Sequence, residues 1–238
     1  MTQRPLQKIS AGQGMVEYAL ILVGVVLIVI LALTTTGTSV EQVYCRALSS
    51  LGGEGCGGCS YAFNNISEFS SWDGPRKDND ISINNNKACF EGHNNGYHHY
   101  LDPCAENMGG DDFVVNVKGA TSVSYPGKNN AGVDILFRSQ DENNGYLFTY
   151  VGWVNQVRFW KKVEGRWILM KAVRVPPGWD GQENDFQLEV KGDTFTAYKD
   201  GSPIAQAVDD TYTEGSAGIR TRKSAVTCIE SMQITSLN

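Results

Sequence analysis

The hydrophobic pattern changes along the chain, and each change marks a different kind of predicted element. Residues 18–40 contain no charged side chain, and residues 19–33 are almost wholly aliphatic. At about 1.5 Å of rise per residue this stretch reaches roughly 30 Å or more, enough for a helix that crosses a bilayer. From Val40 to Leu51 apolar residues recur at the spacing of one helical face. The pattern therefore predicts one long helix that ends before Gly52.

Beyond residue 60 the pattern becomes that of short strands, with alternating or β-branched runs between turn residues. Hairpin signals occur at Glu164-Gly165, at Lys191-Gly192-Asp193 and at Asp200-Gly201. So many evenly spaced strands favour an antiparallel two-sheet sandwich. The predicted fold class is therefore modular α+β, in which a long hydrophobic N-terminal helix precedes a jelly-roll β-sandwich. The expected strands span residues 113–118, 133–138, 146–150, 154–160, 167–170, 185–190, 194–198 and 226–234.

Four segments follow from these patterns. Residues 1–12 are short, polar and basic, and residues 13–51 form the predicted helix. Residues 52–59 hold five glycines and two cysteines, a composition typical of a flexible hinge that disulfides fasten. Residues 60–238 form the predicted sandwich, which is long enough to bury a core of its own.

Composition and charge exclude two classes of protein. The chain has 238 residues, of which 41% are hydrophobic, and this excludes disorder as a description of the whole. The formal net charge is −6, and binding to phosphates needs a basic surface. We therefore expect no nucleic-acid partner.

The six cysteines indicate disulfides and an oxidising compartment. The sequence leaves their pairing open, and it suggests one cluster near the hinge and one in the sandwich. A zinc site at the Cys-x-x-Cys pair of residues 56–59 is the weaker alternative, because no second ligand pair follows. The disulfide candidates are Cys45, Cys56, Cys59, Cys89, Cys104 and Cys228.

One acidic residue, Glu17, stands immediately before the apolar stretch, where an unpaired carboxylate is costly. With Gly12, Gln13 and Tyr18 it forms a pattern that resembles the Flp-type pilins of tight-adherence (Tad) systems, a branch of the type IV pilins. The resemblance implies cleavage between Gly12 and Gln13 by a prepilin peptidase. It also implies that Glu17 pairs with the new amino group of Gln13 on a neighbouring subunit. A signal-anchor helix with an interfacial glutamate is the alternative.

The same resemblance implies where the protein resides and what it meets. Basic residues Arg4 and Lys8 precede the apolar stretch, so the precursor is expected as a single-pass protein of the cytoplasmic membrane with its N-terminus inside. The mature protein is then expected outside the cell, in a surface pilus. The implied partners are other pilin subunits in a homopolymer, the prepilin peptidase, the pilus assembly machinery and the inner membrane before assembly.

The order of strands over residues 85–236 resembles a second family, the concanavalin-like jelly-roll domains of the laminin-G and keto-disaccharide-hydrolase type. The segments that carry this resemblance include 111–118, 130–138, 184–190 and 215–220. Such domains most often bind glycans or proteins, sometimes through calcium. The resemblance implies surface glycans as a further partner.

Few residues of the body suggest specific chemistry. Trp179 lies in a Pro/Gly loop where a sugar ring can stack, and capping of the core is the alternative. Four other tryptophans, Trp72, Trp153, Trp160 and Trp167, lie in strand-like runs and are expected in the core.

Asp78, Asp80 and Asp141 lie in oxygen-rich loops suited to calcium, with solvated acidic turns as the alternative. No other cofactor is expected. The sequence lacks the paired carboxylates of a retaining glycosidase on one strand, and the neighbouring His98 and His99 would point to opposite faces of a strand. We therefore expect no enzyme.

Together these patterns predict a structural subunit of a type IV/Tad-like pilus whose sandwich is displayed outside the filament for adhesion or surface attachment. The alternative is a glycan-binding adhesin that is membrane-anchored or a minor pilin. A sandwich hydrolase is the third hypothesis.

Overall fold

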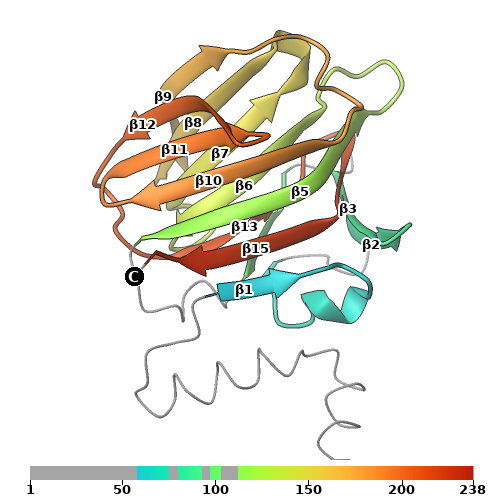
Figure 1. Cartoon of the computed structure of the whole chain (residues 1–238), viewed down its shortest axis with the longest axis horizontal. Coiled ribbons are helices and arrows are strands. Elements are labelled where there is room, and N and C mark those ends of the chain that lie inside the picture. The colour runs from blue at the N-terminus through green and yellow to red at the C-terminus, as the bar shows by residue number, and fades with distance from the viewer. Residues whose placement is uncertain (1–57, 75–79, 93–96, 103–111, 238) are drawn as a thin grey trace, which may run out of the picture. The chain divides into compact units, whose positions relative to one another are not determined.

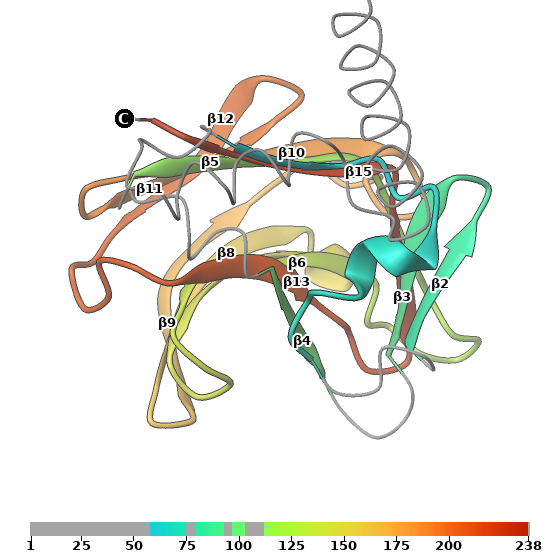
Figure 2. The same ribbon diagram turned by 90° about the horizontal axis from the view of Figure 1, so that it is seen from below.

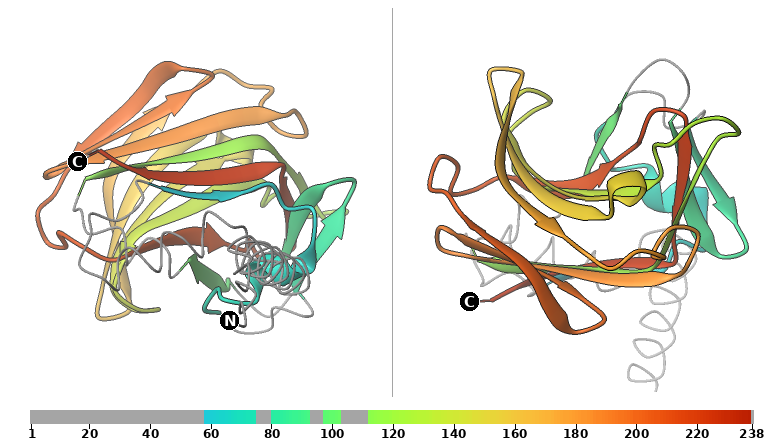
Figure 3. Two further views of the ribbon diagram at one scale, coloured as in Figure 1. Left: turned by 60° about the horizontal axis from the view of Figure 1, so that its bottom comes forward. Right: turned by 90° about the horizontal axis from the view of Figure 1, so that it is seen from above.

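The computed structural model of the chain describes residues 58–74, 80–92, 97–102 and 112–237 (Figure 1). Its elements are fifteen strands and two short 3-10 helices, η1 (Ile66–Phe69) and η2 (Gly152–Val154). The strands form two antiparallel sheets that lie as separate layers in Figures 2 and 3. The body is therefore a β-sandwich.

The larger sheet has nine strands, in the order β12-β11-β10-β5-β14-β3-β2, with β15 beside β5 and β1 beside β15. Its long strand β5 pairs with β15 through residues 113–118 and with β14 through residues 121–124. The strands are β1 (Gly58–Tyr61), β2 (Ile81–Asn84), β3 (Lys87–Gly92), β5 (Phe113–Ser124), β10 (Asn184–Lys191), β11 (Thr194–Lys199), β12 (Ser202–Val208), β14 (Ala225–Ile229) and β15 (Ser231–Ser236).

The smaller sheet has six strands in the order β4-β13-β6-β7-β8-β9. Figure 2 shows that it curves away from the larger sheet at both sides, toward β9 on one and β4 on the other, so its outer face is concave. The strands are β4 (His99–Asp102), β6 (Gly132–Ser139), β7 (Gly145–Val151), β8 (Gln156–Val163), β9 (Arg166–Arg174) and β13 (Ser216–Arg220).

Alternation along the strands explains why these segments pair. In β10, Phe186, Leu188 and Val190 are buried between the sheets, whereas Gln187 and Glu189 between them are half-buried. Strands β6 and β7 differ, because every residue of both is buried. Their inner side chains belong to the core, and their outer side chains are covered by long side chains on the concave face.

The hairpin predictions are confirmed. Glu164 and Gly165 join β8 to β9 with φ angles of 49° and 80°, and Asp200 and Gly201 join β11 to β12 with φ angles of 49° and 77°. Two residues with positive φ match the right-handed twist of the flanking strands. Gly192, also at positive φ, lies between β10 and β11.

The bounds of the predicted strands all shift somewhat in the structure, and two of the differences have a clear structural cause. The segment 226–234 forms two strands, β14 and β15, because each pairs with a different half of β5. The segment 154–160 begins with the end of η2 and with Asn155 in the left-handed conformation, so β8 starts at Gln156.

The predicted α+β fold class is wrong. The described part of the chain is all-β apart from two single-turn 3-10 helices, because its alternating and β-branched runs build strands throughout. The helix predicted over residues 13–51 lies outside the described residues, as do the leader 1–12 and most of the hinge. Gly58 and Cys59 of the predicted hinge belong to β1, which pairs with β15.

The predicted single-pass membrane precursor is likewise corrected. Across residues 58–74, 80–92, 97–102 and 112–237, no helix has the length and apolar character needed to cross a bilayer.

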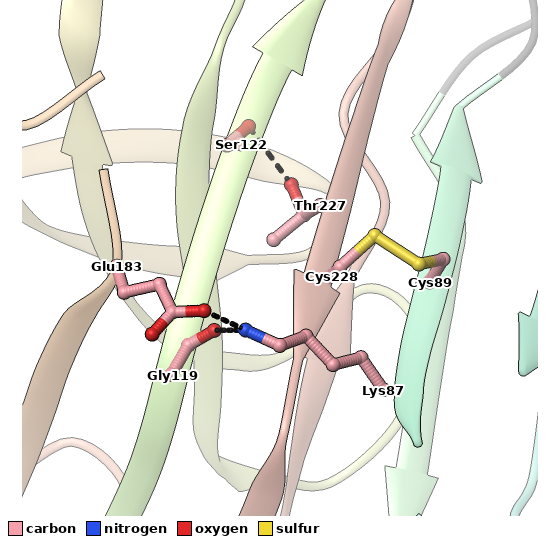
Figure 4. The surroundings of a disulfide bond; sticks show 7 residues. All are labelled: Lys87, Cys89, Gly119, Ser122, Glu183, Thr227 and Cys228. Carbon is pink, nitrogen blue, oxygen red and sulfur yellow. Dashed lines mark hydrogen bonds and ion pairs between the residues drawn. A yellow bond between two sulfur atoms is a disulfide. The ribbon is translucent and has the colours of Figure 1, made fainter. Parts of the chain in front are cut away.

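A disulfide joins two strands of the larger sheet. Cys89 of β3 and Cys228 of β14 are bonded across the register of these strands and are 139 residues apart in sequence (Figure 4). The expectation of a disulfide in the sandwich is thus confirmed for this pair. Cys59 is also disulfide-bonded, and Cys45, Cys56 and Cys104 lie outside the described residues.

We expect the double substitution Cys89→Ser/Cys228→Ser to lower the free energy of unfolding by about 2–5 kcal/mol, because the disulfide closes a long loop in the unfolded chain. Chemical denaturation without reductant measures the difference from the natural chain. A loss below about 1 kcal/mol would show that the unfolded chain gains little freedom when this bond is absent.

Candidate binding groove

The concave face of the six-stranded sheet holds a groove with a volume of about 420 Å³. This volume lies within the range of small-molecule sites in proteins, roughly 300–1,000 Å³. Side chains from strands β7, β8, β9 and β13 and from the adjoining loops meet there. The lining residues are Tyr97, Asn130, Leu147, Thr149, Val151, Trp153, Arg158, Trp160, Trp167, Arg220 and Arg222.

The period of two along β8 places one set of side chains in the core and the other in the groove. Val157 and Phe159 are fully buried in the core, whereas Arg158 and Trp160 line the groove and are partly exposed. Trp167 follows on β9, where it pairs with Lys162 across the hairpin. One face of β8 and β9 therefore carries both aromatic and cationic groups.

A buried carboxylate, that of Asp134 of β6, lies beneath the groove and contacts two of its lining arginines. Its Oδ2 accepts a hydrogen bond from Nε of Arg220 at 2.7 Å and forms an ion pair with Nη2 of the same residue at 2.6 Å. Its Oδ1 accepts a hydrogen bond from Nη1 of Arg222 at 2.6 Å. The hydroxyl of Thr149 also donates to Oδ1. Two guanidinium groups and one hydroxyl thus compensate for the lost hydration of Asp134.

The protonation of Asp134 follows from these contacts. Burial by itself raises the pKa of its carboxyl, but the charges of Arg220 and Arg222 outweigh burial and hold the pKa below its ordinary value. Asp134 is therefore ionised at neutral pH, and together with Arg220 and Arg222 it carries one net positive charge.

Arg222 is fully engaged in holding the groove floor. Its Nε and Nη2 donate to the carbonyl and to the side chain of Asn130, at 2.8 and 3.1 Å, and its Nη1 also donates to Thr149 at 2.8 Å. Residue 132 must be glycine for Arg222 to lie here. A Cβ at this position would lie 2.0 Å from the carbonyl oxygen of Tyr150 and 3.0 Å from Cζ of Arg222.

Hydroxyl groups of the other sheet fix the start of β6, and with it the position of Asp134. Ser122 of β5 accepts a hydrogen bond from the amide of Gly132, and Thr227 of β14 donates to its carbonyl, both at 2.8 Å. The two hydroxyls also bond to each other at 3.1 Å (Figure 4). The end of β6 that borders the groove is thereby fastened to the larger sheet.

Arg220 lies between two aromatic rings. Its Cζ is 4.6 Å from the ring centre of Tyr97 and 5.1 Å from that of Trp167. Cation–π attraction and the two bonds to Asp134 hold this guanidinium in one orientation. The two rings are thereby positioned at the groove as well.

Arg158 is less engaged than the other two arginines. Its Nε donates to the side chain of Gln156 at 2.9 Å, and its Cζ lies 6.0 Å from the ring centre of Trp160. Within the described part of the chain, its Nη1 and Nη2 make no hydrogen bond. This guanidinium therefore presents two free donors to the groove.

His99 of β4 lies beside this site and pairs with Arg220 in the register of β4 and β13. Burial lowers the pKa of His99 to about 3, and the neighbouring charges of Arg220 and Lys162 act in the same direction. The side chain of the preceding residue, His98, contacts the carboxylate of Asp80 instead. His99 is thus neutral in the folded protein at neutral and mildly acidic pH.

Three of the four tryptophans expected in the core lie at the groove instead. Trp72 is buried, as expected, but Trp153 is 59% exposed, and Trp160 and Trp167 line the groove with it. Trp179 packs against the core, with its ring centre 5.3 Å from that of Tyr150, which agrees with the alternative of core capping and not with sugar stacking.

The groove residues Asp134, Arg158, Arg220 and Arg222 were not among the sequence candidates. The alternation Val-Arg-Phe-Trp over residues 157–160 was an available signal, because it assigns arginine and tryptophan to the face opposite the core. Asp134 contacts Arg220 and Arg222, which lie 86 and 88 residues later in the chain. No local sequence pattern could predict these contacts.

The calcium candidates do not come together. Asp80 is buried and accepts a hydrogen bond from Tyr100 at 2.9 Å. Asp141 accepts hydrogen bonds from the side chain of Asn144 in its own turn. Asp78 lies outside the described residues. Among the residues that the structure describes, no three His, Cys, Asp or Glu side chains form a group that could hold a metal ion. Calcium binding stays a prediction.

The sandwich is similar to solved carbohydrate-binding domains. The carbohydrate-binding module CBM66 from Bacillus subtilis matches with a TM-score of 0.55 and 20% identity, over 68% of this chain and 94% of that one. The carbohydrate recognition domain of Emp46p, in its potassium-bound form, matches with a TM-score of 0.53 and 9% identity, over 73% and 94%. The predicted concanavalin-like jelly roll is therefore confirmed as a fold.

An enzyme shares the fold as well. The Crh5 transglycosylase, in complex with NAG, matches with a TM-score of 0.55 and 12% identity, over 77% of this chain and 85% of that one. No family model and no curated protein matches the chain. The pilin resemblance is thus unsupported, and Gly12, Gln13, Glu17 and Tyr18, which carry it, lie outside the described residues.

We expect Arg222→Met to lower the free energy of unfolding by about 3–5 kcal/mol, because it removes one of the two cations that neutralise a fully buried carboxylate. Chemical denaturation measures the change. Arg166→Met, at an exposed position of β9, is the control and should stay within about 0.5 kcal/mol of the natural chain. Equal stability of the two variants would refute a structural role for the Asp134–arginine cluster.

We expect stability to fall as the pH drops from about 6.5 toward 4.5, because His99 takes up a proton when the chain unfolds but stays neutral when folded. The loss is at most about 2.7 kcal/mol, since one pKa unit corresponds to about 1.4 kcal/mol. Besides Arg220 and Lys162, Asp134 and His98 act electrostatically on His99.

His99→Gln is the test of this pH dependence, because glutamine is uncharged throughout the range. The free energy of unfolding is measured at both pH values for both chains. The variant should lose less stability on acidification than the natural chain, and an equal loss would assign the effect to other groups.

Proposed function

We propose that this protein binds glycans and that sugar rings lie in the groove on the concave face of the six-stranded sheet. The observation that carries the proposal is the combination of four aromatic rings with fixed polar groups in one groove of about 420 Å³. The aromatic residues are Tyr97, Trp153, Trp160 and Trp167.

Sugars fit this combination for a physical reason. One face of a pyranose ring exposes C–H groups that pack on aromatic rings, whereas its hydroxyls need hydrogen-bond partners around the rim. Trp153, Trp160 and Trp167 supply the apolar surfaces, and Asn130 and Arg158 supply amide and guanidinium groups. An ordinary apolar ligand would leave these polar groups without partners.

The neighbours in fold support the proposal without deciding it. A carbohydrate-binding module and a carbohydrate recognition domain share the sandwich, at identities too low to transfer a ligand. Binding to glycans gives the protein a role in adhesion or surface attachment.

Binding without catalysis is the function that the groove chemistry favours. Retaining glycosidases use two carboxyl groups about 5–5.5 Å apart, one of which must exchange a proton. The lining residues of the groove include no aspartate or glutamate, and the nearby Asp134 is held ionised beneath them by two arginines. We therefore propose that the protein is not an enzyme, although a transglycosylase shares its fold.

We expect Trp153→Ala to weaken glycan binding about tenfold, because an aromatic surface of the groove is lost while the core is untouched. A glycan array with the full chain identifies a ligand, and titration calorimetry then compares the variants. Val123→Ala is the control, because Val123 is 60% exposed and lies on the other sheet. Absence of binding to any glycan, or equal affinity of Trp153→Ala and the natural chain, would contradict the groove as the site.

A further inference from the structure

The groove is positively charged, although the chain as a whole is negative. Its lining contains Arg158, Arg220 and Arg222, and within the described segments Asp134 is the one carboxylate paired with them. Three guanidinium groups and one carboxylate leave two net positive charges at the site, in a chain of formal net charge −6. This contrast is unexpected for a groove that takes neutral sugars alone.

The register of the strands extends the positive charge beyond the groove. Partners in an antiparallel pair share a face of the sheet, so Arg174, which pairs with Gln156, lies on the same face as Arg158. Lys162 pairs with Trp167 on that face too, and its Nζ is 5.2 Å from the centre of the indole ring. The outer strands β8 and β9 thus add cations to the concave face.

The three groove arginines differ in how much of their hydrogen-bonding capacity is free. Arg222 uses all three nitrogens on Asp134, Thr149 and Asn130. Arg220 uses two on Asp134, and its faces are covered by aromatic rings. Among the residues that the structure describes, Arg158 bonds only through Nε, so the edge formed by its two Nη atoms is open to a ligand.

We propose that the groove binds acidic sugars, which carry a carboxylate or a sulfate, and that Arg158 is the residue that binds the acidic group. The proposal rests on the proposed glycan binding and adds the class of ligand to it. A guanidinium with two free, parallel N–H donors matches the two oxygens of a carboxylate or sulfate. Contact with Trp160 and the bond to Gln156 hold this guanidinium in place before the ligand arrives.

The test compares acidic glycans with neutral partners of the same ring structure. The pairs are trigalacturonate and its methyl ester, sialyllactose and lactose, and dextran sulfate and dextran. Calorimetry with the full chain should give at least about tenfold tighter binding of the acidic member in one or more pairs, since a charge-assisted bond is among the stronger hydrogen bonds. The pair that responds identifies the acidic group as carboxylate or sulfate.

Arg158→Gln should remove the preference for the acidic glycan, so that the ratio of its affinity to that of its neutral partner falls to about one, because the guanidinium that binds the acidic group is lost. The matched control is Arg166→Gln, which removes the same charge from β9 at the position next to Trp167, on the opposite face by alternation. The control variant should bind as the natural chain does.

A measurement on the natural chain alone makes the test independent of variants. Raising the salt concentration from about 0.1 M to about 1 M shortens the screening length from about 10 Å to about 3 Å, so binding of the acidic glycan should weaken and that of the neutral one should not.

Two negative results have different meanings. Equal affinity for both members of every pair, with neutral sugars still bound, would overturn the acidic class and leave the proposed function standing. Absence of binding to all six probes and to a glycan array would overturn both.

Discussion

The ion cluster of Asp134, Arg220 and Arg222 is the interaction on which the groove depends. A carboxylate with no exposed surface is tolerated only when cations and hydrogen bonds replace its water. For Asp134 of β6, Arg220 of β13 and Arg222 of the segment after β13 take the place of this water, although both lie far along the chain from β6. The cluster therefore ties distant parts of the sequence together, directly beneath the proposed binding surface.

The same cluster orients groups that it does not contain. Arg220 reaches Asp134 and is stacked between Tyr97 and Trp167, while Arg222 holds Asn130. Ligand sites need side chains that are fixed before binding, because ordering them afterwards costs affinity. The rigid floor and the aromatic walls of the groove are thus one connected structure, and Arg158 at its side keeps free donors.

The sequence predicted the sandwich better than it predicted the site. Alternation in segments such as 185–190, together with turn pairs such as Asp200-Gly201, depends on local chemistry, so strands and hairpins could be expected. The fold class was wrong because it added a long helix to the sandwich, whereas the described residues are all-β apart from two 3-10 helices. Trp160 was assigned to the core by its residue type, although its position in β8 puts it on the face opposite Phe159. Aromatic residues serve in cores and in binding surfaces alike, and only the register separates the two.

The most direct test of the account is a crystal structure of the full chain with an oligosaccharide identified on a glycan array. We expect the sugar on the concave face of the six-stranded sheet, with a ring against Trp153, Trp160 or Trp167 and with polar contacts to Asn130 or Arg158. A sugar bound on the nine-stranded sheet or at the loops near Trp179, with this groove empty, would contradict the account.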